Sequence, residues 1–92
     1  MMLSEREREI LSLACLSNKQ IAKKLNISYK TVERYFADMF AKTKTARRTE
    51  LLLKAIKHGE LHIVDLGYYN ILGQYVEDLQ IVDLRKEGGN DG

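Results

Sequence analysis

Apolar residues recur with helical spacing after Ser17. Ile21, Ala22 and Leu25 follow one another at steps that place them on one side of a helix, and the lysines of the same stretch fall largely on the other side. Ser17 with Gln20 three residues later is a capping-box pattern. The pattern predicts that a helix begins here.

A second helix is predicted over residues 29–42, after a turn of about three residues. Asn26 tolerates the left-handed backbone that ends a helix sharply, Ile27 can fill the corner, and Ser28 is the next N-cap candidate. This spacing is typical of a helix-turn-helix unit. The segment divides into two sides on a helical wheel. The apolar side consists of Val32, Tyr35, Phe36, Met39 and Thr43. The outward side consists of Lys30, Glu33, Arg34, Ala37 and Ala41.

The outward side has a composition that suits the major groove of DNA. It carries a basic residue in each of its first two turns and small residues further along. Bulky side chains would hold a helix out of a groove about 12 Å wide. We therefore expect residues 29–42 to form a recognition helix.

Two further helices are predicted on either side of this unit. Ser4 and Glu7 form another capping box, and the apolar pattern extends the helix over residues 5–14. Thr49 is an N-cap candidate for a helix over residues 50–58 that stops at Gly59. Apolar residues cover roughly 200° of this last helix, which indicates either deep burial or a partner surface.

The C-terminal extension, residues 62–86, has two possible interpretations. Its apolar residues between 68 and 82 fall within about 140° of a helical wheel, which favours a fifth, amphipathic helix. A near repeat, LHIVDL at 61–66 and LQIVDL at 79–84, instead favours two short strands. We prefer the helix and hence an all-α fold, with the extension packing on the domain or dimerising and with a disordered tail at 87–92.

Basic and capping residues near the two central helices are candidates for contacts with DNA phosphates. Free N–H groups at a helix start attract phosphate, and a basic loop beside a recognition helix contacts the DNA backbone unless it is simply an exposed loop. The candidates from these two features are Ser17, Asn18, Lys19, Lys44, Arg47 and Arg48.

Four segments in order, LSEREREILSLA, SNKQIA, SYKTVERYF and RRTELLLKAIKHGEL, resemble the LuxR/GerE-type DNA-binding domain over residues 3–61. We therefore expect the DNA-binding domain to comprise residues 1–61. The resemblance implies a four-helix domain whose third helix recognises DNA and whose fourth often pairs two subunits. At matching positions it implies base contacts by Glu33, Arg34 and Ala37 and phosphate contacts by Lys30 and Thr31. It also favours a homodimer, for which the candidate interface residues are Leu52, Leu53, Ile56, Leu72, Tyr75 and Leu79.

Composition supports a small DNA-binding domain. The chain has 92 residues and one Cys, at position 15, which is typical of a reducing cytoplasm. Residues 1–58 hold 13 Lys and Arg against 6 Asp and Glu, whereas residues 59–92 hold 2 against 7. The basic part is therefore the part that resembles a DNA binder, although a solvated surface could segregate in the same way.

No catalytic motif or metal site is predicted. His58 and His62 are separated by Gly59, which breaks the helix, and no second pair of ligands lies nearby in the sequence. We expect no enzyme activity, no metal and no cofactor. The favoured hypothesis is a cytoplasmic transcription regulator that binds double-stranded DNA as a homodimer.

Two rival hypotheses stay open. The helix-turn-helix could be a scaffold, with the acidic, tyrosine-bearing extension binding RNA polymerase or another regulator. The chain could also be a fragment like region four of a sigma factor, although its residues 44–61 argue against this.

Overall fold

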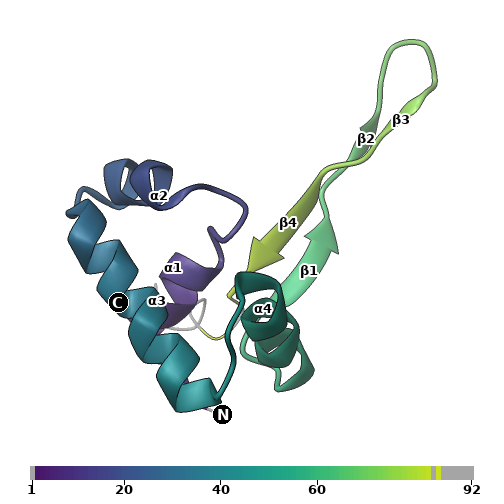
Figure 1. Cartoon of the computed structure of the whole chain (residues 1–92). Coiled ribbons are helices and arrows are strands. Elements are labelled where there is room, and N and C mark those ends of the chain that lie inside the picture. Colours follow the sequence, from purple (N-terminus) through teal and green to yellow (C-terminus); the bar gives the residue numbers. More distant parts are fainter. Residues whose placement is uncertain (1, 84, 86–92) are drawn as a thin grey trace.

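Four helices form the first two thirds of the chain (Figure 1). The computed structural model describes residues 2–83 and 85. Helix α3 is the longest of the four and contacts each of the other three. The helices are α1 (Glu5–Leu11), α2 (Asn18–Leu25), α3 (Tyr29–Thr43) and α4 (Arg48–Lys57).

Serine caps determine where the first three helices begin. The Ser4 hydroxyl accepts a hydrogen bond from the Glu7 N–H at 3.1 Å, and the Glu7 carboxylate accepts one from the Ser4 N–H at 2.8 Å. Ser17 and Gln20 make the same reciprocal pair at 3.1 and 2.8 Å. Ser28 caps α3 through its hydroxyl. Both predicted capping boxes and the predicted third cap are confirmed.

The turn between α2 and α3 is as short as predicted. Asn26 has φ 57° and ψ 47°, which is the left-handed conformation expected at the end of α2. Ile27 donates its N–H to the Ala22 carbonyl at 3.0 Å, and its side chain packs against the core. The helix-turn-helix unit predicted from the sequence is therefore present.

Helix α1 is shorter than predicted. It ends at Leu11 rather than at residue 14, and residues 12–15 form tight turns. Within them Leu13 and Ala14 donate their N–H groups to carbonyls three residues earlier, at 3.0 Å. The Ala14 carbonyl accepts a hydrogen bond from the guanidinium of Arg48 at 2.9 Å, which gives this carbonyl a partner outside a helix.

The predicted N-cap of α4 is wrong. The helix begins at Arg48, so Thr49 lies inside its first turn. Arg47 occupies the N-cap position without a side-chain capping bond. The Arg48 side chain bonds to the α1–α2 connection, and this long-range contact places the helix start earlier than the local sequence indicates.

One hydrophobic core lies between the four helices. It includes side chains from every helix and from the segments that precede α1 and follow α4. The interior side of α3 supplies three of its largest members, as its apolar spacing predicts. The buried apolar residues are Leu3, Ile10, Leu11, Ile21, Ala22, Val32, Phe36, Met39, Leu51, Ala55 and Leu61.

The prediction of a fifth helix, and with it the all-α fold class, is wrong. The extension is an antiparallel β-hairpin that projects from the helices (Figure 1). At its root β1 (His62–Asp65) pairs with β4 (Leu79–Val82), and nearer the tip β2 (Tyr68–Tyr69) pairs with β3 (Tyr75–Val76). The near repeat LHIVDL and LQIVDL therefore marks two paired strands. The predicted disordered tail lies outside the described residues.

The hairpin reverses direction through a tight turn that is incompatible with a continuous helix. The Asn70 side-chain oxygen accepts hydrogen bonds from the N–H groups of Leu72 and Gln74, both at 2.9 Å. Gly73 has φ +79°, which favours glycine over other residues. The apolar residues between 68 and 82 that share one side of a helical wheel are thus separated by a tight turn.

Asp65 joins the two halves of the hairpin. Its carboxylate accepts hydrogen bonds from the Tyr75 hydroxyl at 2.6 Å, the Gly67 N–H at 2.9 Å and the Asp78 N–H at 3.0 Å. A side chain at Gly67 would collide with the Tyr75 ring and with the carbonyl of residue 76, so glycine is required there. We call the resulting structure, residues 62–82, the arm.

Buried ion pairs hold the root of the arm against the helices. The Arg8 guanidinium donates to the Asp83 carboxylate at 2.9 Å and to the Leu3 carbonyl at 2.7 Å. The Glu60 carboxylate, whose residue is 1% exposed, lies 3.8 Å from Arg8 and accepts from Arg85 at 2.8 Å. Removing one partner of such a buried cluster leaves an uncompensated charge, so these pairs stabilise the attachment of the arm.

Among the residues described, no helix combines the length and the apolar character that crossing a bilayer requires.

Acid should loosen the arm. The hydrogen bond from Tyr75, with those from the N–H groups of Asp78 and Gly67, holds the pKa of the Asp65 carboxyl below its usual value. Stability from this group is present above the ordinary Asp pKa of about 3.9 and is lost as the pH falls through the lowered pKa. NMR should show the contact between the Tyr69 and Tyr75 rings, 5.1 Å apart, weakening in that range.

Two variants test the source of this pH dependence. Asp65→Asn should weaken the ring contact at neutral pH and remove the acid transition. Glu77→Gln, at an exposed neighbouring carboxylate, should leave the transition in place. An acid transition that survives in Asp65→Asn would contradict the assignment.

Candidate nucleic-acid interface

The outward side of α3 is an open surface. Lys30, Arg34, Ala37 and Ala41 are exposed, and Glu33 is half-buried. The interior side is buried, because Val32, Phe36, Met39 and Thr43 pack in or beside the core. The structure thus brings the three residues predicted to contact bases, Glu33, Arg34 and Ala37, onto one side of α3.

Glu33 has a neighbour that the sequence analysis missed. Hydrogen bonding to the Glu33 carboxylate, and then its charge, raises the pKa of the Tyr29 hydroxyl one turn earlier. No ion pair joins Lys30 and Glu33 in the part of the chain that the structure describes. Tyr29 is exposed, so it adds an aromatic side chain to the first turn of α3. Its position four residues before Glu33 was the available signal.

The predicted phosphate contacts at the start of α2 differ in their surroundings. The Ser17 hydroxyl serves as the helix cap, and Asn18 accepts a hydrogen bond from Arg48 through its side-chain oxygen. Lys19 is exposed. The N-terminal end of α2 therefore offers one exposed lysine beside a capped helix start.

The remaining predicted phosphate contacts lie at the two ends of α3 and before α4. Lys30 is exposed in the first turn, where the Thr31 hydroxyl also bonds to the Ser28 hydroxyl at 2.8 Å. Lys44 has a left-handed backbone with φ 58° and ends the helix. Both Lys44 and Arg47 are exposed. Cations thus flank the outward side of α3 at both ends.

Arg48 is engaged inside the protein. Its guanidinium donates to the carbonyls of Ala14 at 2.9 Å and Leu16 at 2.7 Å and to the Asn18 side chain. It also lies 4.2 Å from the centre of the Phe36 ring. Burial lowers the pKa of this guanidinium. Arg48 therefore ties the start of α4 to the connection before α2, and its contact with phosphate stays a prediction.

The candidate dimer residues lie on two different elements. On α4, Leu52 and Ile56 are half-buried against the core, whereas Leu53 is 61% exposed. On the arm, Leu72, Tyr75 and Leu79 are all exposed. Dimerisation through these residues stays a prediction.

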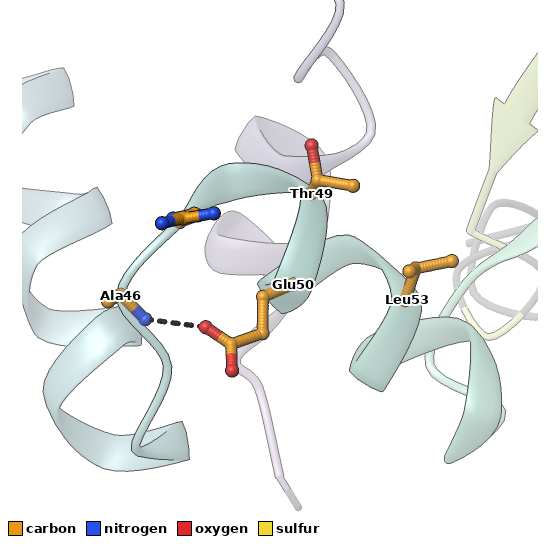
Figure 2. A pocket seen from close by; sticks show the side chains of 5 residues that line it. Ala46, Thr49, Glu50 and Leu53 are labelled. Atoms are coloured by element: carbon orange, nitrogen blue, oxygen red, sulfur yellow. Dashed lines mark hydrogen bonds between the residues drawn. The ribbon is translucent and has the colours of Figure 1, made fainter.

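Beside Leu53 the surface is hollowed at the start of α4. Figure 2 shows the side chains that line this α4 hollow, in which the Glu50 carboxylate accepts from the Ala46 N–H at 2.9 Å. The hollow is lined by Ala46, Arg47, Thr49, Glu50 and Leu53.

Comparison with known proteins agrees with this geometry. Residues 1–55 match the GerE family, described as bacterial regulatory proteins of the luxR family. A probable transcriptional regulator, ycf29, of Cyanophora paradoxa is 47% identical over 55 residues, which cover 58% of this chain and 26% of that protein. The response regulator Rre1 of Synechocystis is 45% identical over 56 residues, 59% of this chain and 24% of that protein.

A third relative has a named regulatory role. The monoamine regulon transcriptional regulator of Klebsiella aerogenes is 44% identical over 52 residues, which cover 54% of this chain and 23% of that protein. The chain spans about a quarter of the length of these relatives. The likeness therefore concerns the helical part, which carries the outward side of α3.

Replacing Arg48 should destabilise the domain. Arg48→Ala leaves three internal acceptors without their donor, and hydrogen bonds to a charged group contribute about 1.5–3 kcal/mol each. We expect the free energy of unfolding in urea to fall by at least about 2 kcal/mol. Arg47→Ala is the matched control. Arg47 precedes Arg48 in the sequence, but its side chain is exposed and makes no capping hydrogen bond. Equal stability of the two variants would contradict the tethering role.

Proposed function

The chain belongs to the luxR family of bacterial regulatory proteins, and we propose that it is a sequence-specific transcription regulator that binds double-stranded DNA. The observation that supports this most directly is the two-sided character of α3. Its interior side is buried in the core, while its outward side is exposed and has cations at both ends.

In the proposed complex α3 lies in the major groove. Ala37 and Ala41 leave space for the helix to approach the bases, since the groove is only about 12 Å wide. Arg34, exposed in the second turn, can donate two hydrogen bonds to the O6 and N7 atoms of guanine. Glu33 can accept from the N4 group of cytosine or orient a neighbouring side chain.

Contacts with the DNA backbone set the position of α3 in the groove. Lys19, Lys30, Lys44 and Arg47 are exposed around its two ends and are the cations available for phosphate. The starts of α2 and α3 add N–H groups with partial positive charge. Such contacts hold the protein in register without selecting a sequence.

The proposal includes a homodimer that acts in the cytoplasm, where bacterial DNA lies. Two copies would place their α3 helices in successive major grooves. Leu52, Leu53 and Ile56 on α4 are candidates for the contact between copies. RNA polymerase is a further candidate partner, which a transcription assay with purified components would test.

Arg34 and Lys30 should differ in their effects on DNA binding. Arg34→Ala should lose about 1–3 kcal/mol of preference at one base pair, because a bidentate contact with guanine is removed. Lys30→Ala should weaken binding to selected and random duplexes equally and lower the slope of affinity against salt by about one. Fluorescence anisotropy titrations at several salt concentrations would measure both effects.

The random duplex serves as the control for each variant. A change in base preference requires that affinity for the selected duplex falls more than affinity for the random one. If Arg34→Ala binds the selected operator as tightly as the wild type does, the outward side of α3 has been assigned wrongly.

The arrangement of the operator tests the dimer. Selection from random duplexes should return two half-sites whose centres are about 10 bp apart, because two copies would use grooves one helical turn apart. Sedimentation of the complex should then give two chains per duplex. A single half-site bound by one chain at saturating protein would contradict this part of the proposal.

A further inference from the structure

Glu33 is the acidic member of the outward side of α3. It is half-buried there, although Lys30 and Arg34 on the same side are exposed. Within residues 2–83 and 85, no ion pair joins Glu33 to either of these cations. The far strands of the arm, β2 and β3, lie away from α3 (Figure 1) and do not cover it. The Glu33 carboxylate therefore takes its partner from within the helix.

That partner is Tyr29. It lies four residues before Glu33 in the same helix, a spacing that brings the Cβ atoms of two side chains to within about 5–6 Å. The Tyr29 hydroxyl donates a hydrogen bond to the Glu33 carboxylate, and this bond, with the charge of the carboxylate, raises the pKa of the hydroxyl. Tyr29 is 41% exposed, so the pair stands at the surface.

The backbone that carries Tyr29 is fixed by the cap of α3. The Ser28 hydroxyl accepts a hydrogen bond from the Thr31 N–H at 3.0 Å, and the two hydroxyl oxygens are 2.8 Å apart. Val32 in the same turn is buried in the core. The Tyr29 hydroxyl is therefore presented from a defined position.

A carboxylate that enters the major groove loses water and requires hydrogen-bond donors in its place. An ionised carboxyl group offers about four acceptor positions on its two oxygens. Tyr29 fills one of them from the protein, and the DNA has to supply a donor for another. Acceptor atoms on a base would instead repel the carboxylate, so the identity of the base decides whether α3 can approach.

Cytosine meets this requirement. In the major groove it presents the N4 amino group as a donor, whereas guanine presents the N7 and O6 acceptors and thymine presents the O4 acceptor and a methyl group. Adenine has a donor at N6, but its N7 acceptor lies beside it and would repel the second carboxylate oxygen. A carboxylate held at this surface therefore selects cytosine.

We propose that Tyr29 is a positioning residue, which holds the Glu33 carboxylate for the N4 group of cytosine and keeps it from pairing with Lys30 and Arg34. This role rests on the proposed DNA binding and names one base of the operator. Adjacent Cα atoms are about 3.8 Å apart, close to the spacing of about 3.4 Å between base pairs. The cytosine should therefore lie within one base-pair step of the guanine that Arg34 contacts.

Titration with four duplexes tests the role of Tyr29. They are the selected operator and its three versions with another base pair at the position where Glu33→Ala loses its preference. The wild type should prefer cytosine there. Tyr29→Phe keeps the ring and should reduce this preference by about 3- to 10-fold, the effect of losing one hydrogen bond of average strength. Tyr69→Phe, at a residue 74% exposed on the arm, is the matched control and should bind all four duplexes as the wild type does.

A double variant separates positioning from direct contact. In a Glu33→Ala background, Tyr29→Phe should cause no further change in affinity, because the carboxylate that the hydroxyl holds is gone. A further loss on every duplex in that background would show that the Tyr29 hydroxyl binds DNA itself, and would overturn the proposal.

The contact between the two side chains can be measured without DNA. In an NMR titration, Tyr29 should lose its proton at a higher pH than an ordinary tyrosine, whose pKa is about 10. Glu33→Gln should lower the pKa of Tyr29, because the charge of the acceptor is removed. An unchanged titration of Tyr29 in Glu33→Gln would contradict the hydrogen bond and the positioning role with it.

Failure of the positioning role can be distinguished from failure of DNA binding. If the wild type binds no duplex at low salt, the proposed function is wrong and the assignment of cytosine is wrong with it. If the wild type binds the selected operator but Tyr29→Phe keeps the full preference for cytosine, only the role of Tyr29 is wrong. If Glu33→Ala loses its preference at a base other than cytosine, the assigned base is wrong although DNA binding stands.

Discussion

Burial of one side of α3 is the constraint on which the rest of the structure depends. Val32, Phe36 and Met39 recur at three- and four-residue steps and are at most 3% exposed. Their burial sets the rotation of the helix about its own axis. A rotation by one residue in either sense would bring a carboxylate, Glu33 or Asp38, towards the core and leave its charge without water or a partner. The core therefore decides which side chains face outward.

Polar contacts then place the other elements around α3. Arg48 stacks on Phe36 and binds the carbonyls before α2, so one guanidinium connects α2, α3 and α4. Arg8 connects the arm to the helices in a similar way, because it lies in α1 and binds Asp83, which follows β4. Replacing a buried ion pair with apolar groups is often neutral for stability, so the value of these contacts lies in the geometry they impose.

Features that depend on neighbouring residues could be predicted from the sequence. The caps at Ser4, Ser17 and Ser28 and the left-handed Asn26 each involve a few adjacent positions. The hairpin of the extension could not be predicted in this way, because its residues satisfy the helical period and the strand repeat equally well. The choice between them depends on Asp65 binding a residue 13 positions later and on Arg8 binding one 75 positions later. The outward side of α3 was predictable from its period, whereas the internal role of Arg48 was not, since its acceptors are 30 to 34 residues away.

The separation of charge along the chain has a structural counterpart at the root of the arm. The basic helices and the acidic arm are opposite in sign, and they meet where Ile81 packs against the core that contains Leu61. Arg8 pairs with Asp83 and lies 3.8 Å from the Glu60 carboxylate, so opposite charges compensate each other at this junction. A displacement of the root that separated these groups would leave a buried charge without a partner, which is destabilising. The same ion pairs that join distant parts of the sequence therefore favour one arrangement of the arm against the helices.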